Sequence, residues 1–388
     1  MTSPKPLTAH ALPPDELRQL YKRYQKSSIP VHDDAGIVDF DDETPNFPAK
    51  HHLVQVGSIT AGNIRNVCNE FNGSDEVNEC GLSLGDFGID RPIYECRGLP
   101  GLQIVPKLLP PETQLCLLTR LLHRDLSNSH HKTNVHTHHH MLYPKGASRA
   151  EAKPSEPYEE HITINQEQVS FFDAQSRSVC FLPKDPVVHK PLTISQFLDK
   201  KLRWMTLGGQ YDWTKKTYPD ETPPAFPGDI ARLLRGILPN MKPQAAIVNL
   251  YSPGDTLSLH RDVSEQCDRP LVSISLGCDA LFVIGAEFEE GNPGSGSTDS
   301  SESGPGRREH LVIRVHSGDA VYMSGKARFA WHGVPKIVKG TCPDFMENWP
   351  ARPNSSTSSQ LPGNDQFEEW SGWMATKRIN LNVRQICE

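Results

Sequence analysis

Two side chains that stand two residues apart, His260 and Asp262, are the first candidates for chemistry in this sequence. In an extended chain, side chains at positions i and i+2 point to the same face, so this imidazole and this carboxylate can reach one ion. A neutral imidazole with a carboxylate suits a borderline divalent metal such as Fe(II). The same spacing also occurs in ordinary solvated loops, so the pair alone does not establish a site.

Two later segments offer the partners that such a site requires. His332 lies in an apolar stretch, where it is either a third metal ligand or a histidine satisfied inside the core. The alternation of residues 378–386 predicts a strand with one apolar face and one polar face. The polar face either meets solvent or lines a cavity in which arginine grips the carboxylates of a small diacid. Its four residues are Arg378, Asn380, Asn382 and Arg384.

The elements that must position these residues are mainly strands. Residues 271–276 and 280–284 are rich in β-branched and large apolar side chains, which predicts strands directly after the His-x-Asp pair. The pair therefore belongs at the edge of a sheet. Apolar spacing predicts amphipathic helices over residues 16–26, 112–123 and 227–238. Residues 27–90 are polar and are interpreted as rich in loops.

Composition limits the class of protein. The 388 residues carry 40 Lys and Arg against 47 Asp and Glu, a formal net charge of −7, which excludes a generally basic coat but leaves room for a local basic groove. No apolar run is long enough for a membrane span, and the N-terminus lacks the apolar core of a secretory signal. Nine scattered cysteines indicate reduced thiols. We therefore expect an intracellular monomer, in the nucleus, cytoplasm or mitochondrion.

A histidine-rich tract and a low-complexity segment stand apart from this pattern. Seven of the 17 histidines fall between His123 and His140. Their spacing is irregular and no carboxylate or cysteine lies among His130–His140, so we expect a solvated loop rather than a metal site. Residues 290–308, rich in Gly and Ser, are expected to form a surface insertion within the catalytic domain.

The order of these pieces resembles the AlkB family of Fe(II)/2-oxoglutarate dioxygenases. The pattern is N-x-Y-x8-H-x-D, then a histidine, then R-x-N-x-x-x-R. It is carried here by Asn249, Tyr251, His260, Asp262, His332, Arg378, Asn380 and Arg384. The match is good from residue 191 to the C-terminus. The segment RPIYECRGLPGLQIVPKLLP and the predicted N-terminal helix are similar to the eukaryotic AlkB-homologue-one subfamily.

The resemblance implies a mostly β fold with flanking helices (α+β). Its core would be a double-stranded β-helix, or jelly roll, at residues 96–388, with an N-terminal helical extension at residues 1–95. The family's metal ligands correspond to His260, Asp262 and His332. The resemblance further implies that 2-oxoglutarate makes an ionic contact with Arg378, with dioxygen as the second co-substrate. Its pocket would be completed by Asn249, Tyr251, Asn380 and Arg384.

The resemblance also implies oxidative demethylation of a methylated base, most simply methyladenine in DNA or tRNA, with release of formaldehyde. A nucleotide-recognition lid would span residues 191–226, where aromatic rings can stack on an extruded base. Candidate substrate contacts are Trp204, Tyr211, Trp213, Ser264 and Glu265. Candidate cations for the phosphate backbone are Lys200, Lys201, Arg203, Lys215, Lys216, Lys326 and Arg328.

Three alternatives remain open from the sequence. The first is a protein demethylase, for example of histones, that uses the same chemistry. The second is a nucleic-acid-binding module on a degenerate oxygenase fold, which the intact ligand set opposes. The third is a zinc hydrolase with the same three ligands, in which the arginine-bearing strand has no role. The modified base and the strand state of the substrate are also left open.

Overall fold

The computed structural model describes residues 8, 10–28, 31, 34–41, 53–73, 88–144, 170–173, 179–219, 221–287, 308–351 and 367–388. The insertion expected at residues 290–308 lies outside this part of the chain, apart from residue 308. Among the described residues, no helix has the length and apolar character needed to cross a membrane.

The larger sheet has eight strands, and every neighbouring pair is antiparallel. Within this sheet, β15 pairs with β10 on one side and with β8 on the other. The order is β1 (Leu53–Ile59), β2 (Arg91–Cys96), β3 (Leu102–Val105), β13 (Ala320–Met323), β10 (Leu271–Gly277), β15 (Arg378–Arg384), β8 (Ala245–Tyr251) and β7 (Trp204–Gly208).

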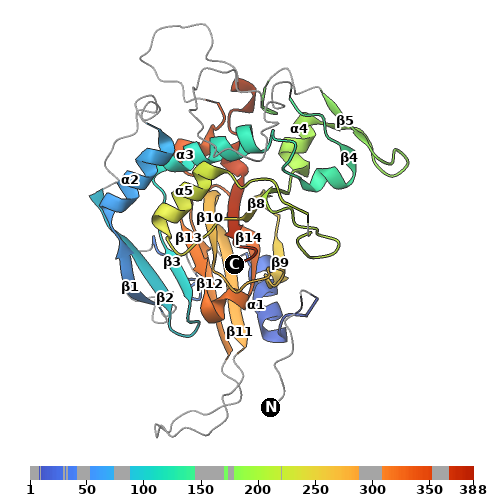
Figure 1. Ribbon diagram of the computed structural model, residues 1–388. Helices are drawn as coiled ribbons and strands as arrows, with labels where there is room; N and C mark the ends of the chain where they lie inside the picture. The colour runs from blue at the N-terminus through green and yellow to red at the C-terminus, as the bar shows by residue number, and fades with distance from the viewer. Residues whose placement is uncertain are drawn as a thin grey trace, which may run out of the picture.

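The smaller sheet has four antiparallel strands and lies beside the larger one in Figure 1. Its order is β12 (Arg308–Val315), β11 (Ala280–Glu287), β14 (Trp331–Ile337) and β9 (Leu257–His260). Residues 278 and 279 alone separate β10 from β11, so the chain passes directly from one sheet to the other. Side chains of both sheets belong to one buried cluster. A mostly antiparallel two-sheet core with helices is consistent with the expected jelly roll.

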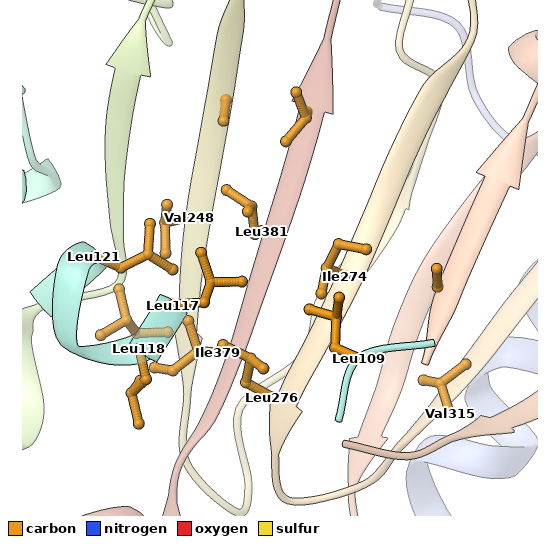
Figure 2. Close-up of a cluster of buried hydrophobic side chains, with 14 of the residues drawn as sticks. Leu109, Leu117, Leu118, Leu121, Val248, Ile274, Leu276, Val315, Ile379 and Leu381 are labelled. Carbon is orange, nitrogen blue, oxygen red and sulfur yellow. The ribbon is translucent and has the colours of Figure 1, made fainter. Parts of the chain in front are cut away.

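Helices cover the outer face of the larger sheet. These are α2 (Ala61–Asn72), α3 (Pro111–Thr119) and α5 (Gly228–Ile237), and a π-helix, η4 (Arg120–Asp125), continues α3. Figure 2 shows leucines of α3 and η4 beside Ile379 and Leu381 of β15. Each such leucine contributes roughly 1.5–3 kcal/mol by leaving water. Because side chains alternate along a strand, this packing turns the arginines of β15 to the opposite face.

Helix α1 (Asp15–Lys26) covers the outer face of the smaller sheet and begins one residue before the predicted start. Leu17 and Tyr24 join a buried cluster with Leu281 and Trp331 of the sheet. The hydroxyl of Tyr21 donates to the carbonyls of residue 257 at 3.0 Å and residue 334 at 3.3 Å. The helix therefore braces the backbones of β9 and β14.

A third sheet of three short strands lies at the upper right of Figure 1, beyond β7. It consists of β4 (His139–His140), β5 (Cys180–Pro183) and β6 (Leu192–Thr193). The remaining elements are short: η5 (Asn134–Thr137), α4 (Ile194–Gln196), η7 (Phe197–Lys201), η8 (Gly325–Phe329), α6 (Asp344–Glu347), η9 (Glu368–Trp370) and η10 (Met374–Thr376).

Two sequence expectations are corrected here. Residues 27–90 include β1 and α2 and are not simply loop; most of β1 is exposed, so its sequence shows little apolar alternation. The histidine-rich tract is not a solvated loop throughout, because His123 and His131 are buried and η5 and β4 lie within it.

Candidate active site

His260, Asp262 and His332 come together at one end of the two sheets. Within the described part of the chain they form the only group of three or more His, Cys, Asp or Glu residues whose ligand atoms lie within 4.8 Å of one another. His260 ends β9 and is directly opposite His332 on β14. The Nε2 atoms of the histidines lie 4.0 and 3.6 Å from the Asp262 carboxylate. The register between β9 and β14 therefore builds the site.

Both histidines present the same nitrogen to this group. The Nδ1 atom of His260 lies 3.0 Å from the carbonyl oxygen of residue 258, and that of His332 lies 3.0 Å from the carbonyl oxygen of residue 330. A carbonyl only accepts, so Nδ1 carries the proton and Nε2 keeps its lone pair. Burial also lowers the pKa of His332 to about 4, which keeps that ring neutral at pH 7. These donors fit a divalent metal with open positions.

Asp262 is buried and is held by Arg384 of β15. The Nη2 atom of Arg384 lies 3.0 Å from each of the two carboxylate oxygens of Asp262. Burial alone would raise the pKa of Asp262, but the neighbouring Arg384 guanidinium outweighs burial and holds the pKa well below its usual range. The carboxylate is therefore ionised and oriented before any metal binds.

Behind Asp262 lies a second buried acid, Glu265. Arg328 donates to its carboxylate at 2.8 Å, and Arg384 lies 3.4 Å from the same carboxylate. Arg328 also donates to the backbone carbonyl of Asp262 at 2.8 Å. The side chains of Glu265 and Arg328 are 1% and 0% exposed. Neither side chain is exposed to solvent, whereas the sequence predicts Glu265 as a base contact and Arg328 as part of a basic rim.

At the other end of β15, Arg378 is buried without a carboxylate. Its Nη1 donates to the carbonyl of residue 278 at 3.0 Å and its Nη2 to Ser275 Oγ at 2.7 Å. Its Nε has no hydrogen-bond partner, and no ion pair joins Arg378 to any acid of the described residues. Burial lowers the pKa of this guanidinium. Asp279 and Asp319 offset part of this charge without forming an ion pair, and a bound carboxylate would offset the rest of a cost of several kcal/mol.

The neighbours of Arg378 are also polar and incompletely satisfied. Tyr251 is directly opposite on β8, and its buried hydroxyl has no hydrogen-bond partner. Burial raises the pKa of this phenol, so it stays a neutral donor. Asn380 donates to Ser273 Oγ at 2.6 Å and is directly opposite Asn249 on β8. This row of donors between the sheets fits a small dicarboxylate.

Known proteins are similar to this chain in sequence over most of its length. A sequence model of the 2OG-Fe(II) oxygenase superfamily matches residues 161–384. The N6-methyladenosine RNA demethylase ALKB1 of Pyricularia oryzae is 43% identical over 98% of this chain and 98% of its own length. The N6-methyladenosine RNA demethylase ALKBH of Cryphonectria parasitica is 52% identical over 59% of this chain and 96% of its own. The tRNA demethylase abh1 of Schizosaccharomyces pombe is 33% identical over 76% of this chain and 82% of its own length.

The chain belongs to the AlkB family of 2OG-Fe(II) oxygenases. It is an Fe(II)/2-oxoglutarate-dependent dioxygenase, and its cofactor and co-substrates are Fe(II), 2-oxoglutarate and dioxygen. The intact ligand group and the buried Arg378 have no place in a degenerate binding module or a zinc hydrolase. Those two alternatives from the sequence are therefore not favoured.

In this AlkB-family chain the aromatic residues of the predicted lid form one cluster. Trp204 and Trp213 have ring centroids 5.0 Å apart, and Tyr211 lies 5.0 Å from Trp213. Trp204 is directly opposite Asn249, which places it on the same face of the sheet as Asn380. The Tyr211 hydroxyl lies 3.3 Å from Ser264 Oγ. The cluster thus lies beside the metal group, and Trp204 contributes to it from β7 of the larger sheet.

Tyr218 and Ser275 are site residues that sequence reasoning missed. Within the lid, Tyr218 links the aromatic cluster to the metal group: its ring is 5.3 Å from that of Tyr211, and its hydroxyl accepts from Arg384 at 3.5 Å. Burial raises the pKa of Tyr218 to about 12. No spacing rule connects these positions to the motif. The only signal for Tyr218 was its place in an aromatic segment.

Proposed function

We propose that this chain oxidatively removes the methyl group of N6-methyladenosine in RNA. The observation that carries the chemistry is the pair of contrasting sites on β15: a preformed His, Asp and His group beside Arg384, and a buried Arg378 with no acid of its own. The relatives matched over most of this chain, which are named as RNA and tRNA demethylases, support the choice of substrate.

The residues of the chain hold, orient and shield the reactants. Bound Fe(II), with 2-oxoglutarate and dioxygen, supplies the oxidising chemistry that converts an N-methyl group to N-hydroxymethyl, which then loses formaldehyde. His260, Asp262 and His332 would hold the metal, and Arg384 keeps Asp262 ionised and in place. Arg378 and Tyr251 would bind the distal carboxylate of the co-substrate.

The aromatic cluster would receive the methylated base. Trp213 is 42% exposed and contacts both Trp204 and Tyr211, so a base extruded from an RNA strand finds ring faces beside the metal group. Stacking of this kind is worth about 1–3 kcal/mol per base. Ser264, which donates to the carbonyl of Lys216 at 2.8 Å, ties the lid to the segment that carries Asp262.

Three finer features belong to the same proposal. Residues before the core, with α1 at their centre, form an extension that supports the metal strands through Tyr21. The protein acts as a monomer. It works inside the cell, which is supported by nine scattered cysteines whose spacing is typical of reduced thiols.

The experiment measures formaldehyde release and loss of the methylated base with Fe(II) and 2-oxoglutarate. The substrates are RNA with N6- or N1-methyladenosine, DNA with N6-methyladenine in paired, bulged and single-stranded forms, and a methylated histone peptide. We expect release from N6-methyladenosine RNA in preference to the rest, and none with Asp262→Ala. Release from DNA alone would replace RNA as the substrate, and release from the peptide alone would make the chain a protein demethylase.

A further inference from the structure

The histidine-rich tract has no part in the site described above, yet it is attached directly to the lid. Residues 132–134 lie along the edge of β7 that does not pair with β8, and Thr133 forms an antiparallel bridge with Met205 there. The backbone amide of Thr206 donates to the carbonyl of Lys132 at 2.9 Å. Asn134 Oδ1 accepts from the amide of Trp204 at 3.3 Å. Residues 132–134 thus extend the larger sheet beyond β7 and lie next to the backbone of Trp204, a lid residue.

From this attachment the chain enters the small sheet of β4, β5 and β6, which presents histidines and lysines together. The amide of Lys184 donates to the carbonyl of His138 at 2.8 Å, and its Nζ donates to the carbonyl of His136 at 2.5 Å. The Nε2 of His139 lies 3.0 Å from the carbonyl of Lys190. We call the set Lys132, His138, His139, Lys184, His189 and Lys190 the histidine–lysine surface.

The charge of this region is opposite to that of the whole chain. Residues 128–144 contain no acid, and together with residues 179–203 they hold six Lys and Arg against two Asp, in a chain of net charge −7. Lys132, Lys184 and Lys190 are exposed, and none forms an ion pair with an acid of the described residues. Arg203 differs, because Asp255 pairs with it. The three lysines are therefore available to a polyanion.

The same surface exposes rings and apolar side chains. The rings of His138 and His189 have centroids 4.4 Å apart, and His139 lies 5.9 Å from His189. Beside them Val187 is 93% exposed and Val188 is 68% exposed. A single nucleic-acid strand matches both properties, since its phosphates meet the lysines while its sugars and bases pack on rings and apolar groups.

We propose that the histidine–lysine surface binds the strand of RNA that flanks the nucleotide being demethylated. The proposal rests on the proposed function and extends it: the lid receives one base, and the surface next to β7 holds neighbouring nucleotides of the same strand. The continuity of residues 132–134 with β7 fixes the two contacts relative to each other. An acidic protein segment is the competing occupant, and the experiment separates the two.

The test compares a variant with a matched control in the full-length chain. The variant is Lys132→Ala/Lys184→Ala/Lys190→Ala. The control is Lys22→Ala/Lys242→Ala/Lys339→Ala, three exposed lysines on other elements. Each protein is assayed on a methylated trinucleotide and on a methylated single strand about 20 nucleotides long. Binding of the unmethylated long strand is measured by fluorescence anisotropy over a range of salt concentrations.

We expect the surface variant to raise KM on the long strand by roughly tenfold or more, with kcat on both substrates and KM on the trinucleotide unchanged. Loss of three phosphate contacts should reduce the log–log salt slope of binding by about 2. The control should match the wild type. Equal behaviour of the variant on long and short substrates, or an equal loss in the control, would overturn the proposal.

Two further arms keep this inference separate from the proposed function. If the wild type demethylates no RNA, the proposed function fails, while the anisotropy measurement still tests the surface without turnover. If polyglutamate of equal charge binds the wild type as tightly as RNA does, and the surface variant loses both equally, the RNA assignment is wrong and an acidic protein partner replaces it.

Discussion

The two ends of β15 each bury an arginine, and they differ in what faces it. Arg384 lies against Asp262 and Glu265, so its charge is compensated within the chain. Arg378 has a carbonyl, a serine hydroxyl and an unpartnered tyrosine hydroxyl nearby, and no ion pair with an acid of the described residues. The first arginine prepares a metal ligand, and the second leaves a charge to be compensated by a molecule from outside.

The largest expected effect is at the Arg384 end of β15, where the charge of the arginine is compensated within the chain. Asp262→Ala removes one metal ligand and leaves Arg384 with Glu265 as its remaining acidic neighbour. We expect loss of Fe(II) binding and of formaldehyde release, measured by metal titration and by turnover on methylated RNA. Retained turnover would show that the metal is held elsewhere.

At the Arg378 end of β15, Arg378→Ala should weaken the binding of 2-oxoglutarate. Loss of one partner from a buried charged pair costs 2–5 kcal/mol, so the KM for 2-oxoglutarate should rise at least about 30-fold. Ser275→Ala, which removes one hydrogen bond to Arg378, is the graded control and should raise it less than tenfold. An unchanged KM in Arg378→Ala would point to another anchor.

The two arginines should also differ in their effect on folding. Without metal and 2-oxoglutarate, Arg384→Met leaves two buried carboxylates with fewer partners and should lower the free energy of unfolding by about 3–5 kcal/mol. Arg378→Met removes an uncompensated charge and should be close to neutral or stabilising. Urea unfolding in a chelator measures both. Equal destabilisation would contradict the difference between the two ends.

Beyond Arg378 lies a group of ion pairs that gives stability a dependence on pH. Burial alone would lower the pKa of His316, but hydrogen bonds and charge from Asp279 and Asp39 outweigh it and raise the pKa to about 10. Other charged groups near the ring are Asp41, Arg314 and Asp319. Because the folded pKa exceeds the unfolded value of about 6.5, this stabilisation is complete below that pH and is lost as pH rises through about 10.

The corresponding measurement is the urea midpoint between pH 6.5 and 10.5. The wild type should lose on the order of a few kcal/mol across this range. His316→Gln should begin less stable and show a flatter profile. A wild-type profile as flat as that of the variant would mean that His316 is not charged in the folded protein.

The smallest effect concerns the backbone of the metal strands. Tyr21→Phe removes one shared hydroxyl donor to β9 and β14, worth about 1 kcal/mol of unfolding free energy. Tyr24→Phe on the same helix is the matched control, because its hydroxyl bonds to Asp34 and not to those carbonyls. Only Tyr21→Phe should also weaken Fe(II) binding. Equal metal affinities in the two variants would limit α1 to a packing role.

The residues predicted from sequence are those whose spacing matches a local rule. The alternation of β15 survives in the structure because it depends only on strand geometry, and His260 and Asp262 meet although Asp262 lies just beyond the end of β9. The burial of Glu265 was not foreseen because its partner Arg328 is 63 residues away, and no local pattern announces such a pair. His131 was expected in solvent, but its ring nitrogen bonds the carbonyl of Asp125 at 2.9 Å and the chain folds over it.

The bridge between Thr133 and Met205 has a consequence for the behaviour of the protein in concentrated solution. β7 ends the ladder of the larger sheet, and an end strand with free amides and carbonyls is a template on which another chain can pair. Residues 132–134 occupy that template, and at the opposite end a bulge between Gln55 and Gly57 distorts β1. Weakening the Thr133 segment should therefore promote aggregation through β7 before it unfolds the core.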